Sequence, residues 1–162
     1  MATNVKAIPI GYHTITPALI VKDAKAAISF YKKAFGAEEK EVFTGPDGRV
    51  MHAEVKIGDS LLMLSDEMPQ TGCLSPTSLK GTSTSLYLYV ENADSLFERA
   101  VKAGAEVAMP MADMFWGDRW GQVSDPFGYK WGIATHKEDL TLDQIRKRSE
   151  QFFASQAKVP QS

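Results

Sequence analysis

The sequence has little thiol chemistry and no long hydrophobic run. Cys73 is the only cysteine, which excludes an internal disulfide and any zinc site built from several thiolates. The opening residues, MATNVKAIPIGYH, lack the apolar stretch of a signal peptide. We therefore expect a cytoplasmic protein.

An excess of charge of one sign is also lacking. The chain has 18 basic and 20 acidic side chains and a net charge of -2, without long runs of one sign. Nucleic-acid and membrane-surface proteins carry basic patches, so we expect neither partner. Glycine-rich phosphate loops and a Gly-x-Ser-x-Gly elbow are absent, which argues against a nucleotide cofactor and a serine nucleophile. With no histidine close to it in sequence, Cys73 is expected to be incidental.

The most informative feature that is present is an internal repeat. Residues 21–38 reappear in outline at residues 90–106, and the pair Lys33-Ala34 recurs 69 residues later as Lys102-Ala103. Two such units must bury their sheets against one another, so the seam between them is where we expect a ligand site.

Apolar periodicity predicts the order β-α-β-β-β in each unit. The first unit is expected to contain a strand over 14–22, a helix over 24–35, and strands over 39–43, 50–57 and 60–65. The second is expected to contain a strand over 84–91, a helix between Asn92 and Gly104, and strands over 105–109, 119–124 and 130–135.

The predicted fold class is therefore α+β, with two βαβββ modules in a single domain over residues 1–139. The modules span about 12–66 and 83–136, and the segment 66–83 reads as a linker or flexible loop. A capping box of Thr141 and Gln144 begins a C-terminal helix within an extension over 140–162.

The repeat, together with the Asp125-Pro126-Phe127-Gly128 turn before the last strand, resembles the vicinal oxygen chelate superfamily. This superfamily contains glyoxalase I, bleomycin-resistance proteins and extradiol dioxygenases, and the similarity covers residues 12–136. The segments ITPALIVKDAKAAISFYKKAFGAEE, GRVMHAEVKIGDSLLMLSDE and FWGDRWGQVSDPFGYKWGIATHKED are most similar to its PhnB-like branch. The resemblance implies eight strands in an open cup and a homodimer.

The resemblance also implies a divalent metal held by side chains on the first and last strand of each unit. Carried over by register, those positions are Thr16, Met63 (Leu62 if the register shifts by one), Ser85 and Gly132. None is a histidine or a carboxylate, and hydroxyl or thioether groups do not hold such ions against water. We therefore expect no metal cofactor at the usual place, and whether the chain is an enzyme stays open.

A relocated site is the alternative. His52 and Glu54 are two residues apart on a predicted strand and so project from the same face. They could be catalytic, either as ligands of a divalent metal together with His13 or as an acid-base pair. The other interpretation is that they hydrogen-bond or pair with a neighbour such as Arg49 or Arg119.

Aromatic residues gather in the segment 111–121, MADMFWGDRWG, which looks too irregular for a simple strand. Aromatic faces beside a guanidinium suit a flat or anionic organic ligand. The structural alternative is that the tryptophans fill the core while Asp118 pairs with Arg119 or caps the loop. The two tyrosines of the strand over 84–91 either face the cup or point outward, as ordinary strand residues or at a dimer interface. The candidate ligand-binding residues are Tyr87, Tyr89, Trp116, Asp118, Arg119 and Trp120.

Three functions follow from these patterns. The first is a metal-independent protein that binds or sequesters a small, partly aromatic or anionic molecule in the cup. The second is a lyase, isomerase or oxygenase that uses His52 and Glu54. The third is an interaction module that acts through the C-terminal helix, with Leu142, Ile145 and Phe152 on one face.

Overall fold

The computed structural model describes residues 5–156. In chain order its elements are β1 (Ala18–Val21), α1 (Ala24–Phe35), β2 (Glu38–Thr44), β3 (Val50–Ile57), β4 (Ser60–Asp66), η1 (Pro69–Thr71), α2 (Pro76–Leu79), β5 (Ser85–Tyr89), α3 (Ala93–Ala103), β6 (Glu106–Asp113), β7 (Asp118–Ser124), β8 (Lys130–His136) and α4 (Leu142–Gln156). No helix among the described residues is both long and apolar enough to span a membrane.

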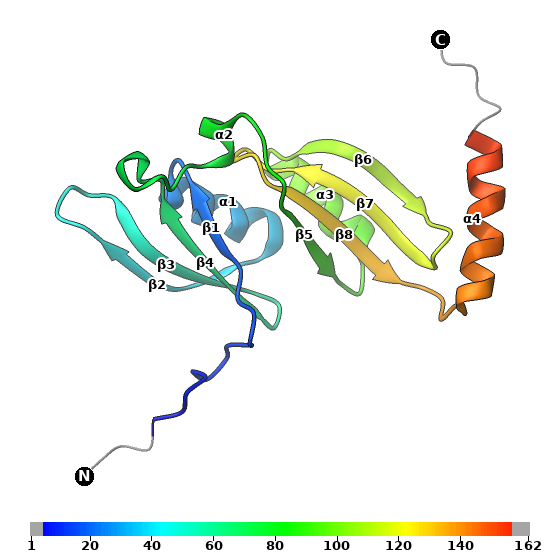
Figure 1. Ribbon diagram of the computed structural model, residues 1–162, viewed down its shortest axis with the longest axis horizontal. Helices are drawn as coiled ribbons and strands as arrows, with labels where there is room; N and C mark the ends of the chain where they lie inside the picture. Colours follow the sequence, from blue (N-terminus) through cyan, green and yellow to red (C-terminus); the bar gives the residue numbers. More distant parts are fainter. Residues whose placement is uncertain (1–4, 157–162) are drawn as a thin grey trace.

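The strands described between residues 5 and 156 form two four-stranded sheets of identical plan, ordered β1-β4-β3-β2 and β5-β8-β7-β6. In each sheet the first and last strand of the unit pair in parallel, and the remaining pairs are antiparallel. Figure 1 shows the sheets side by side, with α4 beyond the second sheet. The predicted α+β fold of two βαβββ modules with a C-terminal helix is confirmed.

Both long helices of the repeat begin and end as their sequences predict. The side chains of Asp23 and Asn92 cap α1 and α3 by accepting from the backbone amides three residues on. Gly36 and Gly104 end the helices in the left-handed conformation.

A second capping contact, which the sequence did not reveal, comes from the end of the last strand of each unit. Asp66 accepts a hydrogen bond from the backbone amide of Ala24 at 2.7 Å, and Thr135 accepts one from that of Ala93 at 2.8 Å. Donor and acceptor are each displaced by 69 residues between the units. Both units therefore attach their helix to their sheet in the same way.

The two units share one hydrophobic core. Helices α1 and α3 pack against each other, and the buried indole of Trp131 on β8 contacts Tyr31 and Phe35 of α1, with ring centroids 5.3 and 4.6 Å apart. The buried carboxylate of Asp125 accepts hydrogen bonds from the Tyr31 hydroxyl at 2.8 Å and the Trp131 indole at 2.9 Å. Burial raises the pKa of Asp125.

The segment between the units contains two short helices, η1 and α2, which its composition did not predict. One carboxylate oxygen of Glu67 accepts from the amide of Ser75 and from the hydroxyls of Ser75 and Ser78. These bonds lower the pKa of Glu67 to about 2. A Cβ on Gly128 would lie 2.8 Å from Pro76, so α2 packs closely on the turn before β8.

Two strand boundaries differ from prediction by four residues each, and the others by at most two. β1 begins only at Ala18, where its parallel pairing with Met63 of β4 starts. β6 continues to Asp113, so much of the segment expected to be irregular belongs to β6 and β7. Pro110 is tolerated because β6 is an edge strand with register shifts between Val107 and Ala112.

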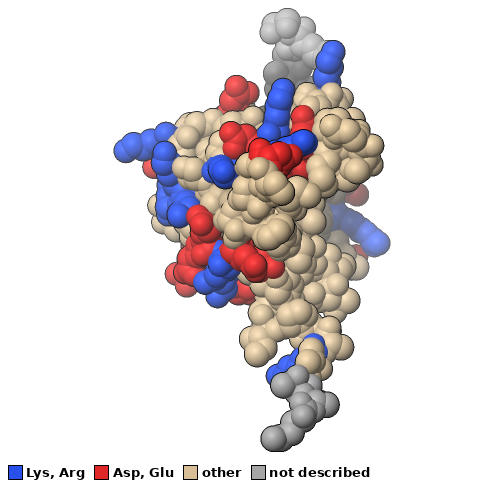
Figure 2. Space-filling model, turned by 90° about the vertical axis from the view of Figure 1, so that its left-hand side faces the viewer, with Lys and Arg blue, Asp and Glu red and all other residues tan. Residues whose placement is uncertain are grey.

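The C-terminal helix α4 begins with the predicted capping box, in which the amide of Gln144 donates to the Thr141 hydroxyl. Phe152 and Phe153 pack on Phe115, with ring centroids 5.5 and 6.0 Å apart, so the helix docks on its own chain. Leu142 is 72% exposed. Acidic and basic side chains are interspersed on the face shown in Figure 2.

Candidate functional site

Each sheet turns one face to the helices and has an open face on the other side. Residues paired across adjacent strands share a face, so Glu54 and Met63 belong together on the first sheet. Gln122, Gly132 and Tyr87 form the corresponding row on the second sheet. These open faces carry most of the side chains that the sequence singled out.

The positions that hold a metal in the resembling family do not fit one here. The hydroxyl of Thr16 donates to the carbonyl of His13 at 3.4 Å, and that of Ser85 donates to the carbonyl of Lys130 at 3.4 Å. Met63 offers only a thioether. Such donors do not retain a divalent ion of the kind these enzymes use.

Gly132 is excluded for a second reason, which is space. A Cβ at this position would lie 2.8 Å from the ring of Tyr87 and 2.9 Å from the indole nitrogen of Trp120. The two aromatic rings cover the strand where a ligating side chain would have to project. Glycine permits their close approach, so this position serves ring packing.

His52 and Glu54 lie together as predicted, but without His13. The Nε2 atom of His52 is 3.1 Å from Oε1 of Glu54, and the hydroxyl of Tyr12 donates to the same oxygen. These bonds lower the pKa of Glu54, and the bond to Glu54 is the main reason why the pKa of Tyr12 rises to about 12.

The alternative of a three-ligand cluster with His13 is not supported by the arrangement of these side chains. Over residues 5–156 no group of three His, Cys, Asp or Glu side chains is arranged to hold a metal ion, and His13 lines a separate cavity. Arg49 pairs with Asp47 rather than with the His52–Glu54 pair. A small cavity of about 260 Å³ lies beside Glu54 and includes Lys40 and Lys56 in its lining.

Five of the six predicted ligand-binding residues come together on the open face of the second sheet, and we call them the aromatic cluster: Tyr87, Tyr89, Trp116, Asp118 and Trp120. The carboxylate of Asp118 is only 3% exposed and accepts from the Tyr89 hydroxyl at 2.9 Å and the Trp116 indole at 3.1 Å. Ring centroids lie 5.0 Å apart for the tyrosines and 5.8 Å apart for the tryptophans.

Arg119 does not join the aromatic cluster, because neighbouring residues on a strand project to opposite faces. Its guanidinium pairs instead with Asp94 of α3 at 2.7 Å. The predicted role of Arg119 as a ligand-gripping cation beside the tryptophans is therefore not supported by its position. Its predicted pairing with Asp118 is also wrong.

The ionisable partner of Asp118 is His136, which the sequence analysis missed. Nδ1 of His136 lies 2.8 Å from Asp118, and its Nε2 lies 3.0 Å from Asp139. Hydrogen bonds to these two carboxylates raise the pKa of His136. Only the register of β7 and β8, which places Asp118 opposite His136, reveals the pair.

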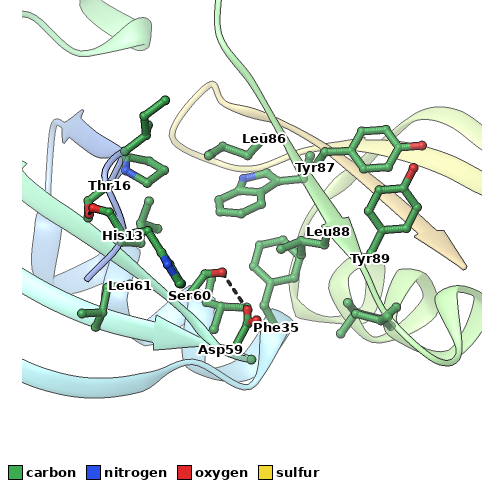
Figure 3. A pocket seen from close by; sticks show the side chains of 18 residues that line it. His13, Thr16, Phe35, Asp59, Ser60, Leu61, Leu86, Tyr87, Leu88 and Tyr89 are labelled. Carbon is green, nitrogen blue, oxygen red and sulfur yellow. Dashed lines mark hydrogen bonds between the residues drawn. The ribbon is translucent and has the colours of Figure 1, made fainter. Parts of the chain in front are cut away.

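A cavity of about 650 Å³ lies between the two units, as Figure 3 shows. Its walls are mainly apolar, and its lining includes Ile15, Phe35, Leu61, Leu62, Leu86, Leu88, Leu96 and Trp131. His13, Thr16 and Ser60 contribute polar groups, and the Ser60 hydroxyl donates to Asp59 at 2.8 Å.

Strand β5 lies between the leucines of this cavity and the rings of the aromatic cluster. Leu86 and Leu88 lie on the cavity side of the strand, whereas the rings of Tyr87 and Tyr89 turn away on the other side (Figure 3). This alternation follows from the two-residue period of a strand. The cavity leucines and the tyrosine rings therefore lie on opposite sides of β5, although Tyr87 and Tyr89 also belong to the cavity lining.

Comparison with known proteins identifies a matching family model and related sequences. A family model described as the Glyoxalase/Bleomycin resistance protein/Dioxygenase superfamily matches residues 12–133. The uncharacterized protein Mb0911c of Mycobacterium bovis is 42% identical over 135 residues, which cover 82% of this chain and 89% of that protein.

Solved structures of other proteins share this fold. Protein PA1353 from Pseudomonas aeruginosa is 25% identical with a TM-score of 0.64, and the match covers 78% of this chain and 100% of that one. The PhnB protein from Bacillus cereus shares the fold at 21% identity, with a TM-score of 0.60 and coverage of 76% and 99%.

Proposed function

Because the chain belongs to the glyoxalase/bleomycin resistance protein/dioxygenase superfamily, we propose that it uses this scaffold to bind a small organic molecule without a divalent metal. The observation that carries the proposal is the cavity of about 650 Å³ between the units. Small-molecule sites typically enclose roughly 300–1,000 Å³ and have apolar walls with a few polar groups. The cavity meets both conditions.

The lining indicates the class of ligand. Phe35 and Trp131 belong to the lining but are nearly fully buried, and leucines from both units complete the walls. The imidazole of His13 and the hydroxyls of Thr16 and Ser60 can orient one or two polar atoms. This combination favours a compact, partly aromatic molecule with few hydrogen-bonding groups.

Thr16 links the proposal to the missing metal. It stands at a position where the resemblance implies a metal ligand, yet it lines the cavity with a hydroxyl and a methyl group. Such a side chain can contact an organic ligand directly. Capture of the ligand therefore depends on shape and burial of apolar surface.

The test uses a matched pair of variants. Thr16→Trp places an indole in the cavity, whereas Thr14→Trp adds the same ring at an exposed threonine outside the lining. With 8-anilinonaphthalene-1-sulfonate as the probe, we expect Thr16→Trp to weaken binding at least tenfold and Thr14→Trp and EDTA to leave it unchanged. Equal loss in both variants, or loss on adding EDTA, contradicts the proposal.

A second candidate function is acid-base catalysis at His52 and Glu54. Their hydrogen bond, with Tyr12 on the same carboxylate oxygen, holds an imidazole next to an ionised carboxylate. Solvent deuterium exchange into a bound carbon acid, followed by NMR, tests it. Glu41→Gln, on the neighbouring strand β2, is the control. Exchange that disappears in His52→Gln and persists in Glu41→Gln supports catalysis. Exchange that is unaffected by His52→Gln rejects it.

We propose further that the protein works as a cytoplasmic homodimer of the PhnB-like branch. Large apolar side chains near the N-terminus support a second copy, since Ile10 and Ile15 are 88% and 84% exposed. Light scattering across a dilution series tests the dimer. A monomeric mass at micromolar concentration rejects it.

A further inference from the structure

The aromatic cluster offers a site that the cavity does not explain. It lies across β5 from the cavity, on the open face of the second sheet, and is built around the carboxylate of Asp118. His136 adds an imidazole to the same carboxylate at 2.8 Å. Aromatic surface and one ionisable donor therefore converge within a few side chains.

The two nitrogens of His136 have very different surroundings. Nδ1 faces Asp118, whose side chain is 3% exposed, while Nε2 faces Asp139, whose side chain is fully exposed at 103%. The contact with the buried Asp118 carboxylate fixes the orientation of the His136 imidazole. The other nitrogen is thereby presented on the solvent side.

The contact between His136 and Asp139 is the part that a ligand could replace. An ion pair with such an exposed carboxylate contributes little, because water solvates the free carboxylate almost as well. A ligand carboxylate at Nε2 would keep the same charge balance. A cationic ligand would lose the favourable interaction with the imidazolium.

Aromatic rings share the carboxylate that holds this imidazole, because the Tyr89 hydroxyl and the Trp116 indole both donate to Asp118. Tyr87 and Tyr89 are 45% and 63% exposed, and Trp116 is half-buried. The indole nitrogen of Trp120 is buried and has no hydrogen-bond partner within residues 5–156. Exposed rings provide a stacking surface for a flat molecule.

We propose that this face binds an aromatic carboxylate, whose carboxylate takes the place of Asp139 on Nε2 of His136 and whose ring packs against Tyr89 and Trp116. Asp139 then acts as an internal competitor, and Asp118 as the group that positions the imidazole. Tyr87 and Tyr89 also belong to the lining of the cavity between the units, but His136, Asp118 and Trp116 do not.

The experiment is isothermal titration calorimetry with 1-naphthoate as the probe and neutral 1-naphthamide as the ligand control. We expect Asp139→Asn to tighten 1-naphthoate binding several-fold and His136→Gln to weaken it at least tenfold. Glu138→Gln, which removes the neighbouring exposed carboxylate paired with Arg148, is the matched control and should leave the affinity unchanged. Binding of 1-naphthamide should be weak in every variant.

Several outcomes overturn the proposal. Equal affinity in the wild type and Asp139→Asn shows that Asp139 does not compete, and this variant is safe for folding because its side chain is fully exposed. A change in dimer dissociation with no change in naphthoate affinity shows that a second copy covers the face. Loss of naphthoate binding in Thr16→Trp assigns the probe to the cavity, so failure here is distinguishable from failure of the proposed function.

Discussion

In the first unit the open face of the sheet carries His52, Glu54 and Met63, whereas the corresponding positions of the second unit carry Trp120, Gln122 and Gly132. The backbone plan is the same in both, with identical strand orders. The first face therefore carries a histidine–glutamate pair, whereas the second carries aromatic rings around Asp118. The comparison teaches that helix and sheet contacts fix the repeated unit, while the side chains on the open face are free to set its chemistry.

The largest expected effect concerns the junction between the units. Trp131→Ala removes the buried indole that contacts α1 and should cost about 4 kcal/mol of unfolding free energy, within the usual range for buried tryptophan. Its counterpart in the first unit, Leu62→Ala, should cost about 3 kcal/mol. Urea unfolding measures both. A smaller loss for Trp131→Ala than for Leu62→Ala would contradict the bridging role of the second unit.

Gly132 tests whether ring packing excludes a side chain from the aromatic face. Gly132→Ala forces Tyr87 or Trp120 to move and should cost about 1–3 kcal/mol. Gly81→Ala is the control, because nothing lies within 4 Å of its Cβ position, and it should change stability by less than about 0.5 kcal/mol. Chemical denaturation of both variants gives the comparison. If Gly132→Ala were as stable as Gly81→Ala, the rings of Tyr87 and Trp120 would be able to move without an energetic cost.

The shared capping contacts should give smaller, similar effects in the two units. Asp66→Ala removes bonds to the amides of Ala24 and Val50, and should cost about 2 kcal/mol. Thr135→Ala removes the bond to Ala93 and should cost about 1 kcal/mol. Thermal unfolding of the two variants measures these losses of stability. No loss in either variant would remove the argument that each unit needs this contact.

The smallest effects are two opposite dependences on pH. Glu67 follows Asp66, and His136 occupies the corresponding place after Thr135. The folded pKa of Glu67, about 2, lies below its ordinary 4.5, so its stabilisation is present above 4.5 and is lost as pH falls toward 2. The folded pKa of His136 is raised above 6.5, so its stabilisation is full below 6.5 and is lost as pH rises through the folded value.

Stability measured by urea unfolding across pH separates the two windows. Glu67→Gln should flatten the acid side only, and His136→Gln should flatten the neutral-to-alkaline side only. If either variant altered both sides, the assignment of each window to one residue would fail.

Much of the fold could be predicted from sequence because caps and periodicity are local signals. Asp23, Asn92 and the two helix-ending glycines fixed α1 and α3, and Thr141 with Gln144 fixed the start of α4. The helices around Glu67 and Ser75 were missed, because three hydrogen bonds to one carboxylate stabilise a segment whose composition is typical of a loop.

The site was predictable only in part. Residue type was enough to predict that Tyr87, Tyr89 and Trp116 belong to one site with Asp118. Arg119 was wrongly included, because strand alternation places its side chain on the opposite face, where it pairs with Asp94. His136 could not be found without the β7–β8 register. The cavity depends on how the two units pack, which no local pattern encodes.

The most direct test of the central claim is native mass spectrometry of untagged protein purified without added metal, compared before and after dialysis against EDTA. The account predicts a bound organic molecule that survives the chelator and is absent from Thr16→Trp. A stoichiometric divalent ion whose removal releases the ligand would contradict it.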